Sequence, residues 1–130
     1  MVTRVIGRVI AVWHSSVAPT DADWSLFLDA VRAADLATAR GFVLTAGGTP
    51  TAAQRRALME LVGSHAVPLA VVSDLGRVRF AASLFAMMTK RLRSFATSEV
   101  EAACAHLALS DYESRRIREF VLEYADLAPP

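Results

Sequence analysis

Three short groups of polar residues carry the side chains of this chain that could do chemistry. They are His14-Ser15-Ser16, Gly47-Gly48-Thr49 with Thr51, and Ser73-Asp74 with Arg77. Their imidazole, hydroxyl, carboxylate and guanidinium groups are those used in acid–base catalysis, nucleophilic attack and anion binding. Each group follows a short apolar run, which is the pattern of a buried strand. Because ligands of open α/β sheets bind beyond the carboxyl ends of the strands, we expect the three groups to share one edge of a sheet.

These groups allow two kinds of site. Gly47 and Gly48 precede a predicted helix start, where backbone N–H groups together with Arg77 would bind an anion or a nucleotide phosphate. His14, Ser73 and Asp74 have the residue types of a hydrolase. However, the chain contains no GxxxxGK[ST] or GxGxxG phosphate loop and no GxSxG nucleophile turn. Since Gly, Ser, Asp and Thr also end strands and cap helices, the sequence favours a non-enzymatic protein, with small-ligand binding as the alternative.

The chain has no pattern of metal ligands. His14, His65 and His106 stand far apart in the sequence, and no Cys or His pair has the spacing of a zinc site. The single cysteine, Cys104, lies in an apolar helical stripe, which is typical of a buried thiol. We therefore predict no metal, no cofactor and no internal disulfide.

The composition indicates one domain with a substantial apolar core. The chain has 130 residues, 54% of them hydrophobic, and a mean hydropathy of +0.36, so some apolar surface is expected in an interface. A net charge of +1 argues against binding to nucleic acid. The apolar runs at residues 66–72 and 80–88 are too short to cross a bilayer, and the first residues lack the apolar core of a signal peptide. We expect a cytoplasmic protein.

Four capping signals mark predicted helix starts. Each places a hydroxyl residue three positions before an acidic or amide residue: Thr20 before Asp23, Thr51 before Gln54, Ser98 before Glu101, and Ser110 before Glu113. The first side chain can accept a hydrogen bond from an N–H of the first turn, and the second can accept one from the N–H of the cap. Helices are therefore predicted from about residues 20, 52, 98 and 111, with a further one over 78–90.

The apolar runs between these helices predict strands at 3–6, 8–13, 42–45, 68–72 and 91–95. Gly7 makes the first two strands either a tight hairpin or one strand with a bulge. Strands that alternate with helices pair in parallel through right-handed crossovers. The sequence thus predicts an α/β fold: an open, mostly parallel sheet of four to five strands, with helices packed on it and an extra C-terminal helix.

The predicted helix over 78–90 is apolar around most of its circumference. Its large apolar side chains are Phe80, Leu84, Phe85, Met87 and Met88. Such a helix is either enclosed by the fold or has a second apolar face for a partner. These residues are the first candidates for the surface of a homodimer or of a complex with a partner protein.

The predicted element order, β-β-α-β-α-β-α-β-α-α, is similar to that of STAS domains, the anti-sigma-factor-antagonist fold, including the SpoIIAA-like group. The resemblance is carried by residues 67–74 (VPLAVVSD), 78–85 (VRFAASLF) and 92–107 (LRSFATSEVEAACAHL). STAS domains have a similar C-terminal half, with a buried strand, a helix, a short strand and a capped helix. The resemblance covers residues 4–107, so residues 1–109 would form the STAS-like domain and residues 110–130 an added C-terminal helix.

The resemblance implies a bacterial regulatory module, without enzymatic activity, that binds a partner protein. STAS antagonists carry an Asp-Ser-(Ser/Thr)-Gly phosphorylation segment at the start of their second helix. Residues 46–54 stand at that place here and lack this motif, although Thr49 and Thr51 offer hydroxyls. The partner edge, and any phosphorylation, are therefore expected at Thr49 and Thr51, with Ser73 and Asp74 at the neighbouring strand end.

Overall fold

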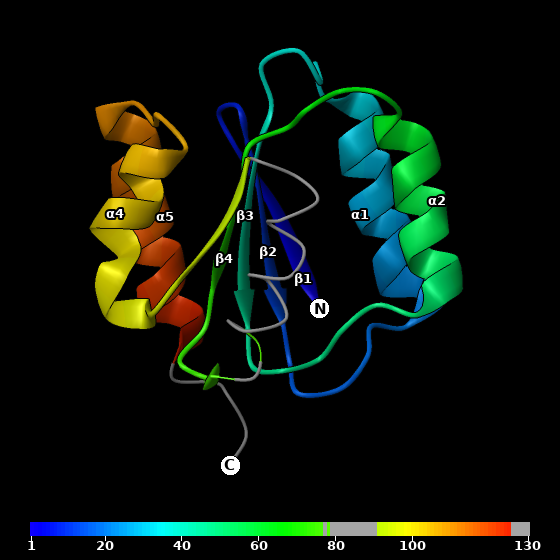
Figure 1. Ribbon diagram of the computed structural model, residues 1–130, viewed down its shortest axis with the longest axis horizontal. Coiled ribbons are helices and arrows are strands. Elements are labelled where there is room, and N and C mark those ends of the chain that lie inside the picture. The colour runs from blue at the N-terminus through cyan, green and yellow to red at the C-terminus, as the bar shows by residue number, and fades with distance from the viewer. Residues whose placement is uncertain (77, 79–90, 126–130) are drawn as a thin grey trace.

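A five-stranded sheet with helices on both faces forms the centre of the protein. The computed structural model describes residues 1–76, 78 and 91–125. The helices α1 (Asp21–Ala33) and α2 (Ala52–Val62) cover one face of the sheet, and α4 (Val100–His106) and α5 (Asp111–Tyr124) cover the other (Figure 1). The predicted α/β fold with a C-terminal helix is confirmed.

The strands lie side by side in the order in which they occur along the chain: β1 (Val2–Ile6), β2 (Val9–His14), β3 (Arg40–Thr45), β4 (Leu69–Val72) and β5 (Leu92–Phe95). β1 is antiparallel to β2, whereas β2 to β5 are parallel. Gly7 and Arg8 form a two-residue turn between β1 and β2, and Gly7 has a φ of 56°, which favours glycine. The first two strands are therefore a tight hairpin and not one bulged strand.

Three of the four capping signals are confirmed. The Thr20 hydroxyl accepts from the N–H of Asp23 at 3.1 Å. Thr51 with Gln54, and Ser110 with Glu113, form complete capping boxes, in which each side chain accepts from the backbone N–H of the other residue. These bonds satisfy N–H groups that a helix start otherwise leaves without a partner.

The capping signal at Ser98 is wrong. Ser98 lies inside a short 3-10 helix, η1 (Thr97–Glu99), which precedes α4. The Glu99 carboxylate accepts from the N–H of Ala96 at 2.8 Å, and the Asp74 carboxylate accepts from the N–H of Thr97 at 2.8 Å. Because these two carboxylates bind the free N–H groups of the turn, α4 begins only at Val100 and Ser98 does not cap it.

The larger part of the core lies between the sheet and the helices α4 and α5. Phe42 of β3 and Phe120 of α5 meet edge to face, with their ring centroids 6.3 Å apart. Trp13 stacks on Tyr124 at 5.5 Å. On the other face of the sheet, α1 buries Trp24, Leu28 and Val31. The C-terminal helix is thus part of the same core as the sheet.

Ion pairs fix α5 to the N-terminal hairpin. The Glu113 carboxylate is buried and accepts from the backbone N–H of Arg8 at 2.8 Å and from its guanidinium at 2.8 Å. The Arg8 guanidinium is the main cause that lowers the pKa of Glu113 to about 2. Near the other end of α5, Glu123 accepts two hydrogen bonds from the Arg4 guanidinium, at 2.6 and 2.9 Å. Strand β1 and the turn that follows it are therefore bonded to the last helix.

Part of the predicted partner surface lies outside the described residues. This holds for the predicted helix over 78–90, apart from Val78, and so for Phe80, Leu84, Phe85, Met87 and Met88, and also for Arg77. Within the described ranges, no helix is both long enough and apolar enough to cross a membrane.

Candidate functional site

A row of buried polar side chains crosses the carboxyl edge of the sheet, where β2, β3 and β4 end. His14 is paired in register with Thr45, and the β3–β4 register places Ser73 beside Thr45. Paired side chains of a sheet point to the same face. Here this is the face covered by α1, because Val12, two residues before His14, packs against that helix. His14, Thr45 and Ser73 are only 7%, 9% and 2% exposed.

The turn at Gly47 and Gly48 packs against the loop that follows β2. The N–H of Gly48 donates to the carbonyl of Ser15 at 2.8 Å, and the N–H of Gly47 donates to the Thr45 hydroxyl at 3.0 Å. A Cβ atom at Gly48 would overlap the carbonyl oxygens of Ser15 and Val17. Both N–H groups that the sequence offered to an anion are therefore bonded within the protein, and Gly48 is needed for loop packing.

Gln54 joins the N-terminal ends of α1 and α2. It is 5% exposed, and its side-chain amide donates to the carbonyl of Pro19 and to the carboxylate of Asp21, both at 3.0 Å. The indole N–H of Trp24 donates in turn to the carbonyl of Gln54 at 3.0 Å. Because the same side chain also closes the capping box with Thr51, the loops before both helices form one hydrogen-bonded unit.

Ser73 and Asp74 also serve the local fold. The Ser73 hydroxyl accepts from the N–H of Leu75 at 3.2 Å, and the Asp74 carboxylate is the one that accepts from Thr97. These two bonds fix the loop after β4 to itself and to the start of η1. Ser73 is too deeply buried to meet a partner protein directly, whereas Asp74 is exposed.

The imidazole of His14 is not fully hydrogen-bonded. Its Nδ1 is buried and has no hydrogen-bond partner. Burial, which penalises the charged form, lowers the pKa of His14 to about 4. The imidazole is therefore neutral at physiological pH, and the predicted grouping of His14, Ser73 and Asp74 does not include a bond from Nδ1 to either of the other two.

The surface above this buried row carries apolar side chains and side chains with hydroxyl groups. Val17, in the loop after β2, is 67% exposed, and Leu75, in the loop after β4, is 38% exposed. Thr49 and Thr51 are exposed between them in the loop after β3, and the Thr51 hydroxyl already caps α2. We call the set formed by Val17, Thr49, Thr51, Asp74 and Leu75 the carboxyl-edge surface.

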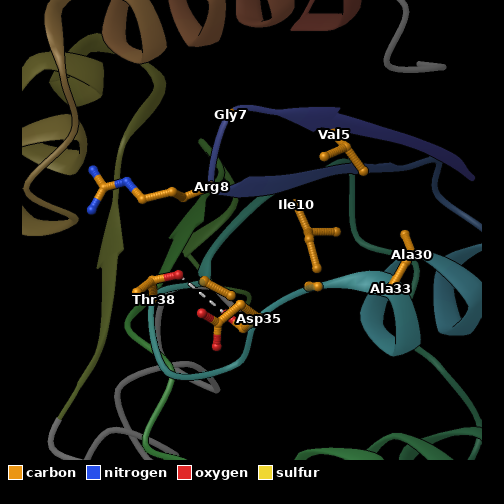
Figure 2. Close-up of a pocket in the computed structure, with 10 residues that line it drawn as sticks. Val5, Gly7, Arg8, Ile10, Ala30, Ala33, Asp35 and Thr38 are labelled. Carbon is orange, nitrogen blue, oxygen red and sulfur yellow. Dashed lines mark hydrogen bonds between the residues drawn. The ribbon is translucent and has the colours of Figure 1, made fainter.

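A hollow lies at the opposite, amino edge of the sheet, between the β1–β2 hairpin and the end of α1 (Figure 2). Its volume is about 300 Å³, and it is lined mainly by apolar side chains, among them Val5, Ile10, Ala30 and Ala33. The Arg8 side chain extends away from it (Figure 2), and its guanidinium donates to the carboxylate of Glu113. No prediction from the sequence covers this hollow; the alanines in the last turns of α1 are the signal that could have indicated it.

Two buried polar residues at the carboxyl edge were also missed as part of the site. Thr45 could be identified from the strand alignment, since it is the last residue of β3 and lies level with His14. Gln54 was read only as a cap, because its contacts with Pro19 and Asp21 join segments more than 30 positions apart. Local sequence patterns carry no signal for such contacts.

Among the residues that the structure describes, no group of three or more His, Cys, Asp or Glu side chains is arranged to hold a metal ion. The carboxyl edge combines a buried polar layer with the exposed carboxyl-edge surface above it. No protein-family model, no curated protein and no solved structure matches this chain.

Proposed function

We propose that this protein is a cytoplasmic, non-enzymatic regulatory module of the STAS/SpoIIAA-like kind, and that it binds a partner protein through the carboxyl-edge surface. The observation that carries the proposal is the contrast at this edge between polar groups that are bonded within the protein and apolar side chains that are exposed. The Thr45 and Ser73 hydroxyls and the Asp74 carboxylate are engaged in local hydrogen bonds, while Val17 and Leu75 are exposed at the same edge.

This contrast favours the binding of a partner protein over catalysis. A catalytic group must be able to reach a substrate, but Ser73 and His14 are buried. A binding surface instead benefits from rigid loops, because little conformational entropy is then lost on association. The bonds of Gln54 and Gly48 supply that rigidity under Thr49 and Thr51.

The test compares two valines of similar exposure at opposite ends of the sheet. Val17→Arg places a charge on the carboxyl-edge surface, whereas Val5→Arg places one at the amino edge, where Val5 is 63% exposed. The partner is identified by affinity capture from the source cells and its affinity is then measured with purified proteins. We expect Val17→Arg to weaken this binding by about tenfold or more, which is about 1.4 kcal/mol, and Val5→Arg to leave it unchanged.

Unchanged affinity of the purified partner for the Val17→Arg protein would contradict the proposal. Mass spectrometry of the captured protein tests in addition whether Thr49 or Thr51 carries phosphate, a modification that would place two negative charges on this surface.

A further inference from the structure

The outer edge of β1 has no strand beside it among the described residues. β1 pairs with β2 on one side only. The carbonyls of Arg8 and His14 bond toward β3, so the odd-numbered residues of β2 face β1 and bond to Val2, Arg4 and Ile6. The backbone N–H and C=O groups of Thr3 and Val5 therefore point away from the sheet. An edge of this kind is a template for one more strand.

An exposed apolar side chain and an apolar hollow lie next to each other at this edge. Val5 is 63% exposed and, with Ile10, Ala30 and Ala33, lines the hollow of about 300 Å³ (Figure 2). The small side chains of Ala30 and Ala33 leave space beside β1 on the face that carries α1. A strand added to β1 would place alternate side chains at this hollow.

We propose that the strand added here belongs to a second copy of the chain. In this dimer the two β1 strands pair antiparallel about a two-fold axis at Val5, and each Val5 packs over the hollow of the other copy. The contact is self-complementary, because the same residues provide both the side chain and the hollow that receives it. A two-fold axis also bonds the outward N–H and C=O of Val5 to those of Val5 in the second copy.

Charge disfavours the register that has its axis at Arg4. Arg4 is the single charged residue of β1, and an axis at Arg4 would set two arginines directly opposite each other, which is destabilising. An axis at Val5 instead sets Arg4 opposite Ile6 of the second copy. Each Arg4 also keeps its own partner, because its guanidinium is bonded to Glu123 within the chain. The edge is therefore close to neutral when two copies meet.

The outer face of α1 supports the same axis. Leu26 is 66% exposed and lies one helical turn before Ala30. When two copies of α1 run antiparallel with Ala30 near the axis, Leu26 of one copy faces the small Ala33 of the other. Small residues at such a crossing allow a short distance between helices. The interface thus extends from the strand to the helix above it.

Sedimentation analysis over a range of concentrations tests the proposal. We expect the wild-type chain to form a dimer and Val5→Arg to weaken dimerisation by about tenfold or more. Val17→Arg, with a comparable exposed valine at the other edge, should dimerise as the wild type does. Thr3→Pro serves as a second variant: it removes an outward N–H but no bond to β2, and it should weaken the dimer as well. Thermal unfolding verifies that each variant is folded.

A wild-type chain that stays monomeric at all concentrations would overturn the dimer. A dimer that persists in folded Val5→Arg or folded Thr3→Pro would overturn its location at β1. Neither result would contradict the proposed function. That proposal predicts the opposite pattern, in which Val17→Arg weakens partner binding and Val5→Arg leaves it unchanged.

Discussion

His14 is the residue whose burial has the clearest chemical consequence. Its imidazole is 7% exposed, with Nδ1 unbonded, at a place where the sequence alone suggests a catalytic or binding side chain. A buried imidazole without a partner for its proton is stable only in the neutral form. The residue therefore contributes to the core of the carboxyl edge, and protonation of its imidazole is coupled to unfolding of the protein.

Acid is expected to destabilise the protein through His14. Burial lowers the pKa of His14 from 6.5 to about 4, so on acidification the unfolded chain takes up the proton first. The stability that depends on neutral His14 is fully present above pH 6.5 and is lost as the pH falls from 6.5 to about 4, by about 3 kcal/mol. Urea unfolding at several pH values within this window measures the loss.

Two substitutions separate His14 from other titrating groups. His14→Leu should flatten the profile between pH 6.5 and 4, whereas His65→Gln, at an exposed histidine, should retain the wild-type slope. A His14→Leu profile that is as steep as the wild-type profile would show that another group is responsible.

At the scale of elements, the loops after β2 and β3 depend on each other through Gly48. The backbone of Gly48 lies so close to the carbonyls of Ser15 and Val17 that no side chain fits between them. This contact determines how β2 and β3 lead into α1 and α2. The same contact supports the exposed part of the carboxyl-edge surface.

Gly48→Ala is expected to destabilise the fold by about 2 kcal/mol or more, because the added methyl group must displace backbone atoms. The matched control is Gly76→Ala, where a Cβ meets no atom within 4 Å and the change should stay within about 0.5 kcal/mol. Urea unfolding gives both values. Equal stability of the two variants would rule out the close approach at Gly48.

Most elements could be predicted from the sequence, because apolar spacing and caps are local signals. Thr51 and Ser110 cap the helices that their spacing predicts. Ser98 fails because the carboxylate of Asp74, more than 20 positions away in the chain, binds the N–H of Thr97. Gly48 was open to two interpretations, since an anion loop and a close backbone approach both require glycine.

The sequence could predict where the candidate site lies on the sheet, but not how deeply its side chains are buried. Parallel strands bring His14 and Ser73 to one edge, as expected. Their burial could not be foreseen, because residue type and strand ends do not reveal which face of the edge the loops cover. The hollow beside Val5 likewise depends on where α1 crosses the sheet, which no local pattern specifies.

At the scale of the whole molecule, Glu113 connects the two ends of the described chain. Its carboxylate is buried and binds both the backbone and the guanidinium of Arg8, 105 positions earlier. The C-terminal helix α5 is therefore bonded to the start of the sheet and shares its core. Its four buried apolar residues cover β1 to β3: Ile117, Phe120, Val121 and Tyr124.

Glu113→Gln is expected to lower the free energy of unfolding by about 2 kcal/mol at pH 7, less than for a fully buried pair because Arg8 is 40% exposed. The pKa of Glu113 is lowered to about 2, so the contribution of its charge is present above pH 4.5 and is lost between pH 4.5 and about 2. Urea unfolding at both ends of this range measures it.

Glu123→Gln is the matched control at the exposed pair with Arg4, where the loss of stability should be smaller because solvent screens the pair. If removing the charge of Glu113 costs no more than removing that of Glu123, the buried pair is not what holds α5.

The contact between Arg8 and Glu113 joins segments that are synthesised at different times. A ribosome delivers the hairpin first and the helix that covers it last, about 100 residues later. Until then, the side of the sheet that carries Val9 and Phe42 lacks the part of its core that α5 supplies. The core on this side of the sheet is therefore complete only after the last helix has been synthesised.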